Sequence, residues 1–81
     1  MSKRYELFET IIATVNLPDH QVLAGDLGTI VEVYTNPEIA YDVEFVNPDG
    51  TTRALLTLAT HQIRRISSKD VITTRQAALA V

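Results

Sequence analysis

The sequence predicts an all-β protein that forms a small barrel of five strands. Runs of β-branched and aromatic residues alternate with polar residues, most regularly in segments 41–46 and 51–58. Short clusters containing glycine, proline or asparagine separate these runs, as expected for tight turns. Because 81 residues leave room for one domain, we expect the barrel over residues 1–66 and a tail over residues 67–81.

The first strand is predicted within residues 7–17, LFETIIATVNL, which are rich in β-branched residues. Both faces of this strand would carry apolar side chains, as in a strand half wrapped by a small barrel. Pro18 would end the strand, and residues 19–26 would form a polar loop.

The stretch GDLGTIVEVY, residues 25–34, places a Gly-x-x-Gly corner before a run of β-formers. Gly25 and Gly28 would adopt a positive φ or allow close approach of another chain segment, and both are costly for other residues. A strand is expected over residues 29–34, until the Asn-Pro pair within residues 35–38 interrupts the pattern.

Residues 41–58 predict an antiparallel hairpin. In segment 41–46 the inward residues would be Tyr41, Val43 and Phe45, and the outward residues would be Asp42 and Glu44. In the turn NPDG, Pro48 suits the first central position of a type I turn and Gly50 suits a left-handed position.

The register of this hairpin depends on the length of its loop. A four-residue loop would pair Glu44 with Arg53 and place Ala54 and Leu56 beside the inward residues. A three-residue loop with a bulge at Gly50 would shift the pairing by one and exchange the faces. We favour the first register, because it buries apolar residues together and pairs opposite charges across the strands.

The remaining elements are short. Residues 59–62 predict one 3₁₀ turn, and residues 63–66 predict the last strand, anchored by Ile63 and Ile66. In the tail, the Val-Ile-Thr-Thr run opposes the helix-favouring residues after Arg75, so we expect a frayed or weakly helical segment. Five strands with short turns and one helical turn before the last strand fit a small barrel, which removes most sheet edges.

Composition and charge narrow the function classes. A net charge of −3 and a pI near 5.1 lower the expectation of a nucleic-acid partner. The absence of cysteine excludes disulfides, thiolate metal sites and thiol nucleophiles, and is compatible with a cytoplasmic location. The charged start MSKRYELFE does not resemble a signal peptide, and no run approaches the roughly 20 apolar residues that span a membrane.

Little in the sequence indicates catalysis or a cofactor. His20, His61 and Asp26 could hold a metal if their loops met, but the spacing does not require it, and a structural or solvated role is expected instead. Arg64 and Arg65 are adjacent in a strand and would point to opposite sides. We expect a non-enzymatic protein without cofactor or metal, because a filled barrel leaves no pocket to shift carboxylate pKa values.

Four blocks of the chain resemble a family of short bacterial proteins, often cyanobacterial, classed as a domain of unknown function. The blocks are F-x-x-I-x-A-T-V-x-L-P-x-H (8–20), L-x-G-D-L-G-T-I-V-E-V (23–33), Y-D-V-E-F-V-x-P-D-G (41–50) and A-L-L-T-L (54–58). The resemblance covers residues 5–66 and implies an SH3-like barrel without established catalytic residues. It also loosely implies an association with toxin or antitoxin genes.

The favoured function is a protein-interaction module, a monomer or weak homodimer, with an antitoxin or immunity-like protein as its specific version. An acidic surface would complement a basic partner. The candidate partner-binding residues are Asp19, His20, Glu32, Tyr34, Asp42, Glu44 and Arg53. The alternatives are a nucleic-acid accessory similar to KOW modules and, by analogy with nitrile hydratase, an accessory subunit of a larger enzyme. The terminal AALAV also resembles a tail recognised by proteases, although an ordinary chain end is favoured.

Overall fold

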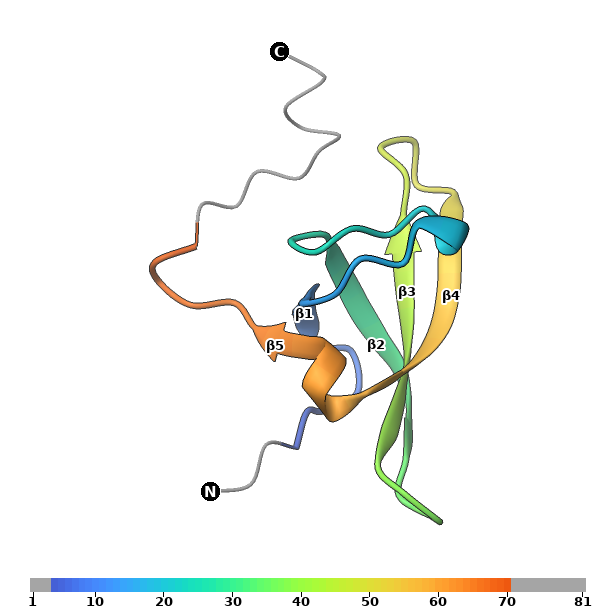
Figure 1. Ribbon diagram of the computed structural model, residues 1–81, viewed down its shortest axis with the longest axis vertical. Coiled ribbons are helices and arrows are strands. Elements are labelled where there is room, and N and C mark those ends of the chain that lie inside the picture. The colour runs from blue at the N-terminus through green and yellow to red at the C-terminus, as the bar shows by residue number, and fades with distance from the viewer. Residues whose placement is uncertain (1–3, 71–81) are drawn as a thin grey trace.

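A computed structural model describes residues 4–70 and shows one five-stranded antiparallel sheet with two single-turn 3₁₀ helices (Figure 1). The elements in chain order are β1 (Thr10–Ala13), η1 (Pro18–His20), β2 (Leu27–Tyr34), β3 (Ala40–Val46), β4 (Thr52–Ala59), η2 (Thr60–Gln62) and β5 (Ile63–Arg65). The all-β class and the helical turn before the last strand are therefore confirmed.

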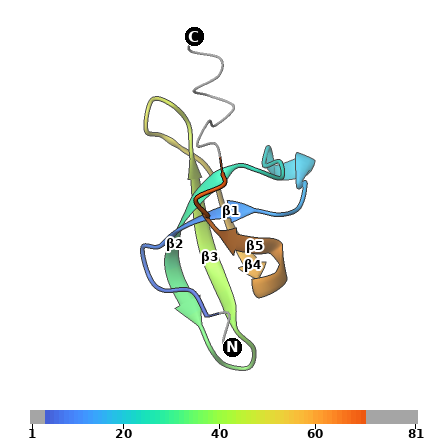
Figure 2. The same ribbon diagram turned by 90° about the vertical axis from the view of Figure 1, so that its left-hand side faces the viewer.

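The sheet is not closed into a barrel by hydrogen bonds, in contrast to the closed barrel expected from the sequence. Its strand order is β4-β3-β2-β1-β5, so β4 and β5 are the two edges and do not pair with each other. The long strands β2, β3 and β4 form a meander, and the short strands β1 and β5 lie across it (Figures 1 and 2). The three residues of β5 are used in pairing with β1, which leaves the far side of β4 without a partner strand.

One apolar core lies against the inner face of this sheet. All five strands contribute to it, and the predicted inward residues Tyr41, Val43 and Phe45 are fully buried. The remaining buried members of the cluster are Tyr5, Ile11, Ala13, Val22, Ile30, Leu58 and Ile63. Because one cluster gathers side chains from every strand, the sheet curls around its core and exposes one continuous outer face.

Tyr5 joins the N-terminal segment to this core. Its backbone N–H donates to the Tyr41 hydroxyl at 3.0 Å, and its own hydroxyl donates to the carbonyl of Ile63 at 3.3 Å. The two tyrosine rings meet edge to face with centroids 5.5 Å apart. The segment before β1 thus connects β3 with β5.

The first strand is shorter than the predicted segment 7–17. Phe8 has a φ of 68°, so the extended backbone begins only after it, and β1 spans Thr10–Ala13. Downstream, residues 18–20 form η1 where the predicted polar loop begins, and Gln21 ends that turn in a left-handed conformation. The loop is fixed by Asn16, whose side-chain oxygen accepts from the N–H of Ala24.

The two glycines of the Gly-x-x-Gly corner serve different needs. Gly25 has a φ of 99°, which disfavours residues with a side chain. Gly28 instead allows close packing, because a Cβ there would lie 2.5 Å from Val43 Cγ1 and 2.9 Å from Phe45 Cε1. The corner therefore brings the start of β2 directly onto the β3 core residues.

The β3–β4 register differs from the favoured prediction, although the faces agree. Gly50 has a φ of 89°, and its N–H donates to the carbonyl of Asn47, with Pro48 between them. This turn pairs Val46 with Thr52, as in the shorter-loop alternative. A second irregularity then makes Arg53 an extra residue, so that Ala54 faces Phe45. The predicted Glu44–Arg53 pair is wrong, because Glu44 faces Leu55, but the two shifts together restore the predicted faces.

The predicted helical or frayed tail lies largely outside the described residues, as does the terminal AALAV. Within residues 4–70, Ser67–Asp70 form a turn in which the Asp70 N–H donates to the Ser67 carbonyl at 3.0 Å. Neither 3₁₀ turn of this part of the chain is long and apolar enough to cross a membrane.

Candidate functional site

The outer face of the β2–β4 meander carries a row of acidic side chains. Glu32 on β2 lies opposite Asp42 on β3, and Glu44 follows two residues along the same strand. The alternation that buries Tyr41, Val43 and Phe45 turns Asp42 and Glu44 outward. Tyr34, beyond Glu32 on β2, completes the set, which we call the acidic face.

Hydrogen bonds hold the carboxylates of β3 in place. Asp42 accepts from the hydroxyl of Tyr34 at 2.7 Å and from that of Thr57 at 2.6 Å. Glu44 accepts from the hydroxyl of Thr52 at 2.6 Å. The Glu44 carboxylate therefore lies toward β4, whereas Asp42 has one oxygen on each side and bridges all three strands of the meander.

The electrostatic field of the acidic face acts on Tyr34. The hydrogen bond to Asp42 raises the pKa of Tyr34, and the negative charges of Asp42 and Glu32 act in the same direction. The phenol thus remains a neutral donor well into alkaline solution.

Exposed apolar groups accompany these carboxylates. Leu55 on β4 lies opposite Glu44 and is 59% exposed, and Tyr34 is 42% exposed. Acidic groups around a few exposed large side chains are a composition suited to protein contact, in which the aromatic and aliphatic groups supply much of the binding energy.

The other three candidate residues lie at the free edge of β4 instead. Asp19 and His20 of η1 face Arg53–Leu56 of β4 across a hollow of about 380 Å³. Both residues are exposed, and the His20 side chain makes no hydrogen bond to another residue in the range 4–70. This hollow, the edge hollow, lies beside the acidic face and not within it.

Arg53 is largely buried in an ion pair. Its side chain is 9% exposed, and its Nη2 lies 3.2 Å from Oδ2 of Asp26, which is 3% exposed. Asp26 also accepts from the N–H of Leu23 at 2.9 Å, while Nε of Arg53 is buried without a partner. The bulge at Arg53 explains this position, because the extra residue leaves the alternation that would direct it toward Glu44.

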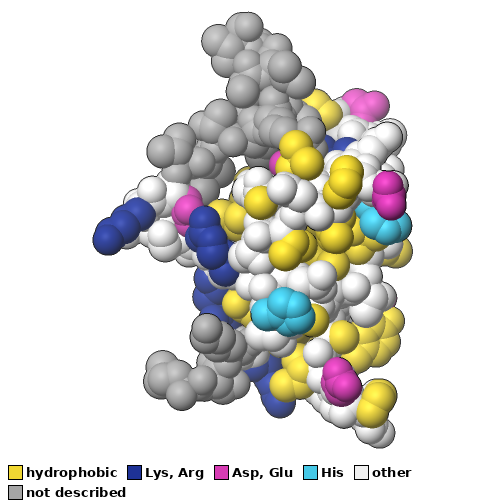
Figure 3. Space-filling view, viewed as in Figure 1, with side chains coloured by type: hydrophobic (Ala, Val, Ile, Leu, Met, Phe, Trp, Pro, Cys, Tyr) yellow, Lys and Arg dark blue, Asp and Glu magenta, His cyan; other side chains and the backbone are white. Residues whose placement is uncertain are grey.

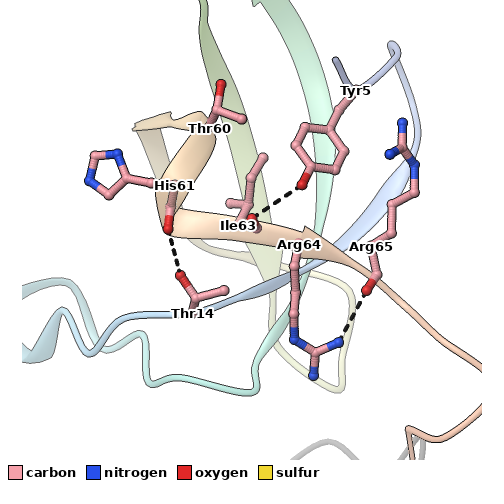
Figure 4. A pocket seen from close by; sticks show the side chains of 7 residues that line it. All are labelled: Tyr5, Thr14, Thr60, His61, Ile63, Arg64 and Arg65. Carbon is pink, nitrogen blue, oxygen red and sulfur yellow. Dashed lines mark hydrogen bonds between the residues drawn. The ribbon is translucent and has the colours of Figure 1, made fainter. Parts of the chain in front are cut away.

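A second hollow, of about 590 Å³, lies between β5, η2 and the end of β1 (Figure 4). Arg64 and Arg65 both line it, but their side chains leave β5 in opposite directions, as strand alternation predicts. Arg64 makes two hydrogen bonds to Asp70, at 2.8 and 2.9 Å. Arg65 pairs with Glu9 at 2.7 Å and stacks over the Tyr5 ring at 4.6 Å.

The two histidines lie apart. His20 lines the edge hollow and His61 lines the hollow beside β5, and Figure 3 shows the two side chains well separated. Residues 4–70 contain no group of three or more His, Asp or Glu side chains placed to hold a metal. The loops of His20, His61 and Asp26 therefore do not form the hypothetical metal site.

Charge is distributed unevenly over the molecule. Lysine and arginine side chains gather on the side of β5 and the N-terminal segment (Figure 3). Within residues 4–70, the acidic face contains no ion pair, because the paired carboxylates are Asp26, Glu9 and Asp70.

Two of these features were not predicted from the sequence. The first is Leu55, which was not among the candidate residues. The predicted inward positions of Ala54 and Leu56 on either side are the signal that could have identified it as exposed. The second is the Asp26–Arg53 pair, which the sequence does not signal, because it depends on a bulge 27 residues away from Asp26.

The fold and this face define a small all-β domain with one curled antiparallel sheet and an acidic outer surface. The chain belongs to the family described as a domain of unknown function, DUF4926, whose model matches residues 7–65. No curated protein and no solved structure matches the chain.

Proposed function

We propose that this protein is a non-enzymatic interaction module of the SH3-like type, and that its acidic face binds a basic protein partner. The observation that carries the proposal is the set Glu32, Asp42 and Glu44, which lie on one face without a neutralising cation in residues 4–70. Like charges held together raise the free energy of the isolated protein, and a cationic partner relieves that cost.

The fixed geometry of the carboxylates supports binding. The hydroxyls of Thr52, Thr57 and Tyr34 orient the carboxylates before a partner arrives. Less conformational entropy is therefore lost on association. Leu55 and Tyr34 add apolar contact area beside the charges.

The specific version of the proposal is an antitoxin or immunity-like protein that covers a basic, nucleic-acid-directed toxin. Complementary charge would speed the encounter and block the surface with which the toxin contacts nucleic acid. An accessory subunit of a larger enzyme would use the same face, and that version rests on analogy of fold alone.

A capture experiment with matched charge variants tests the proposal. The face variant carries Glu32→Gln, Asp42→Asn and Glu44→Gln, and the control carries Glu6→Gln, Glu38→Gln and Asp49→Asn. We expect the unmodified protein and the control to retain basic proteins of the native host. The face variant should retain about tenfold less of these proteins. Equal retention by both variants would contradict the proposal.

The hollow beside β5 favours one alternative, a nucleic-acid accessory, because Arg64, Arg65 and His61 all line it. Salt-sensitive binding of single-stranded RNA or DNA, weakened by Arg64→Glu, would support this alternative. Arg53→Glu is unsuitable for the test, because Arg53 is buried against Asp26. The absence of detectable RNA or DNA binding at low salt would eliminate the alternative.

A further inference from the structure

Beyond the bulge at Arg53, the outer edge of β4 lacks the features that usually protect an edge strand. β4 is an end of the sheet and pairs with β3 alone. From Ala54 to Ala59 it contains neither a charged residue nor a proline, which are common means of blocking an edge. Such an edge is a template for another extended chain.

The backbone groups on this edge can be assigned by alternation. The N–H of Ala59 donates to Oε1 of Gln62 at 2.9 Å, so it points away from β3. Because the outward groups of an antiparallel strand recur at every second residue, Leu55 and Thr57 also direct their N–H and C=O groups outward. No backbone hydrogen bond from another described segment reaches residues 52–59 on this side.

The edge hollow gives an incoming chain a place to enter. It separates η1 from Arg53–Leu56, and its volume of about 380 Å³ is within the usual range of ligand sites. Arg53 lines it with a side chain more than nine-tenths buried, of whose donors the buried Nε has no partner. The hollow therefore combines the open strand edge with an unused donor that could donate to a carbonyl oxygen after a small movement.

Two carboxylates of the acidic face have an oxygen on the side of the same edge. Oδ1 of Asp42 accepts from Thr57 of β4, and Oε2 of Glu44 accepts from Thr52 of β4, which places these two oxygens on the β4 side. A strand added to β4 would lie two strand spacings, or roughly 10 Å, from β3. A lysine or arginine side chain on that strand would reach across β4 to these carboxylates.

We propose that the β4 edge binds an extended basic segment of a protein partner as a sixth, antiparallel strand, a mode that rests on the proposed function of the acidic face. Leu55 and Thr57 supply the main-chain hydrogen bonds, and Asp42 and Glu44 select for lysine or arginine at alternate positions. A second copy of this chain is a poorer occupant, because pairing two β4 edges would bring two acidic faces together.

The test uses the full chain and a short acetylated peptide in which lysine and threonine alternate. A fully N-methylated version of that peptide keeps its charge but cannot donate main-chain hydrogen bonds. We expect the parent peptide to bind about tenfold more tightly than the methylated one. We also expect the parent peptide to slow amide hydrogen exchange at Leu55 and Thr57.

Each other outcome overturns the inference in a recognisable way. Equal binding of both peptides would exclude strand addition and leave the acidic face intact as a binding surface. No binding of either peptide would exclude the basic strand, while the capture experiment would still decide the proposed function. Concentration-dependent protection of Leu55 and Thr57 without peptide would assign the edge to a second copy.

A pair of variants gives an independent comparison at the same position. Leu55→Pro removes the outward N–H, whereas Leu55→Thr removes the leucine side chain and keeps that donor. Peptide binding should be lost in the first variant and retained in the second. If Leu55→Pro does not fold, the comparison of the two peptides on the unmodified protein decides the question.

Discussion

The guanidinium of Arg53 lies 3.2 Å from the carboxylate of Asp26 and joins the bulge of β4 to the loop before β2. Because both side chains are buried, the pair makes the position of the edge hollow dependent on Asp26.

Removing Asp26 should therefore destabilise the protein strongly. Asp26→Ala would leave a buried guanidinium unpaired, with its Nε already lacking a partner, at an expected cost of roughly 3–5 kcal/mol. Urea denaturation measures this loss. The control Glu38→Ala, at an exposed position, should change stability by less than about 0.5 kcal/mol. Similar midpoints for the two variants would refute the structural role of the pair.

Gly28→Ala tests the close approach of β2 to β3. The added methyl would overlap Val43 and Phe45 and should cost about 1–3 kcal/mol. The same substitution in a Val43→Ala background should cost less, because the nearest atom, Val43 Cγ1, is absent. Thermal unfolding of the unmodified protein, the two single variants and the double variant gives the coupling energy between the two positions. Strictly additive effects would mean that the overlap with Val43 does not cause the destabilisation.

The hydrogen bond between Tyr34 and Asp42 predicts a pH dependence at the alkaline end. The folded pKa of Tyr34 is raised above its ordinary value of 10.0, so this bond stabilises the fold fully below pH 10.0. Its contribution is lost as the pH rises through the folded pKa. Ultraviolet difference absorbance should show that Asp42→Asn lowers the pKa of Tyr34 while Glu38→Gln leaves it unchanged.

The pair formed by Arg64 and Asp70 predicts the opposite behaviour at the acid end. The hydrogen bonds from Arg64 and the N–H of Ser67 lower the pKa of Asp70 well below its ordinary value of 3.8. The contribution of this pair is therefore complete above pH 3.8 and is lost as the pH falls through the folded pKa. In carboxyl-carbon NMR titrations, Arg64→Ala should move the pKa of Asp70 back toward 3.8, and an unchanged titration would contradict the pairing.

Local sequence patterns were sufficient to predict most of the sheet. Alternation identified β3 and its faces, and the turn residues Pro48 and Gly50 located the hairpin, because both signals depend on neighbouring residues. Closure of the sheet was not predictable in this way, since it depends on whether β4 and β5 meet after the η2 turn.

The candidate site was predictable to a similar degree. Glu32, Tyr34, Asp42 and Glu44 share a face because they alternate with core residues on adjacent strands. The position of Arg53 required knowledge of two irregularities in one hairpin, each of which exchanges the faces. A single-residue shift of this kind leaves no trace in the polarity pattern.

Tyr5 bears on how the domain should be trimmed for experiments. The family match begins at residue 7, whereas the ring that bridges Tyr41 and the carbonyl of Ile63 belongs to residue 5. A fragment cut at the family boundary would open a hole beneath Arg65 and leave the Tyr41 hydroxyl without the N–H that it accepts. Shortened versions used for partner screening should therefore retain the residues in front of the family match, or a weakened scaffold will be mistaken for a lost contact.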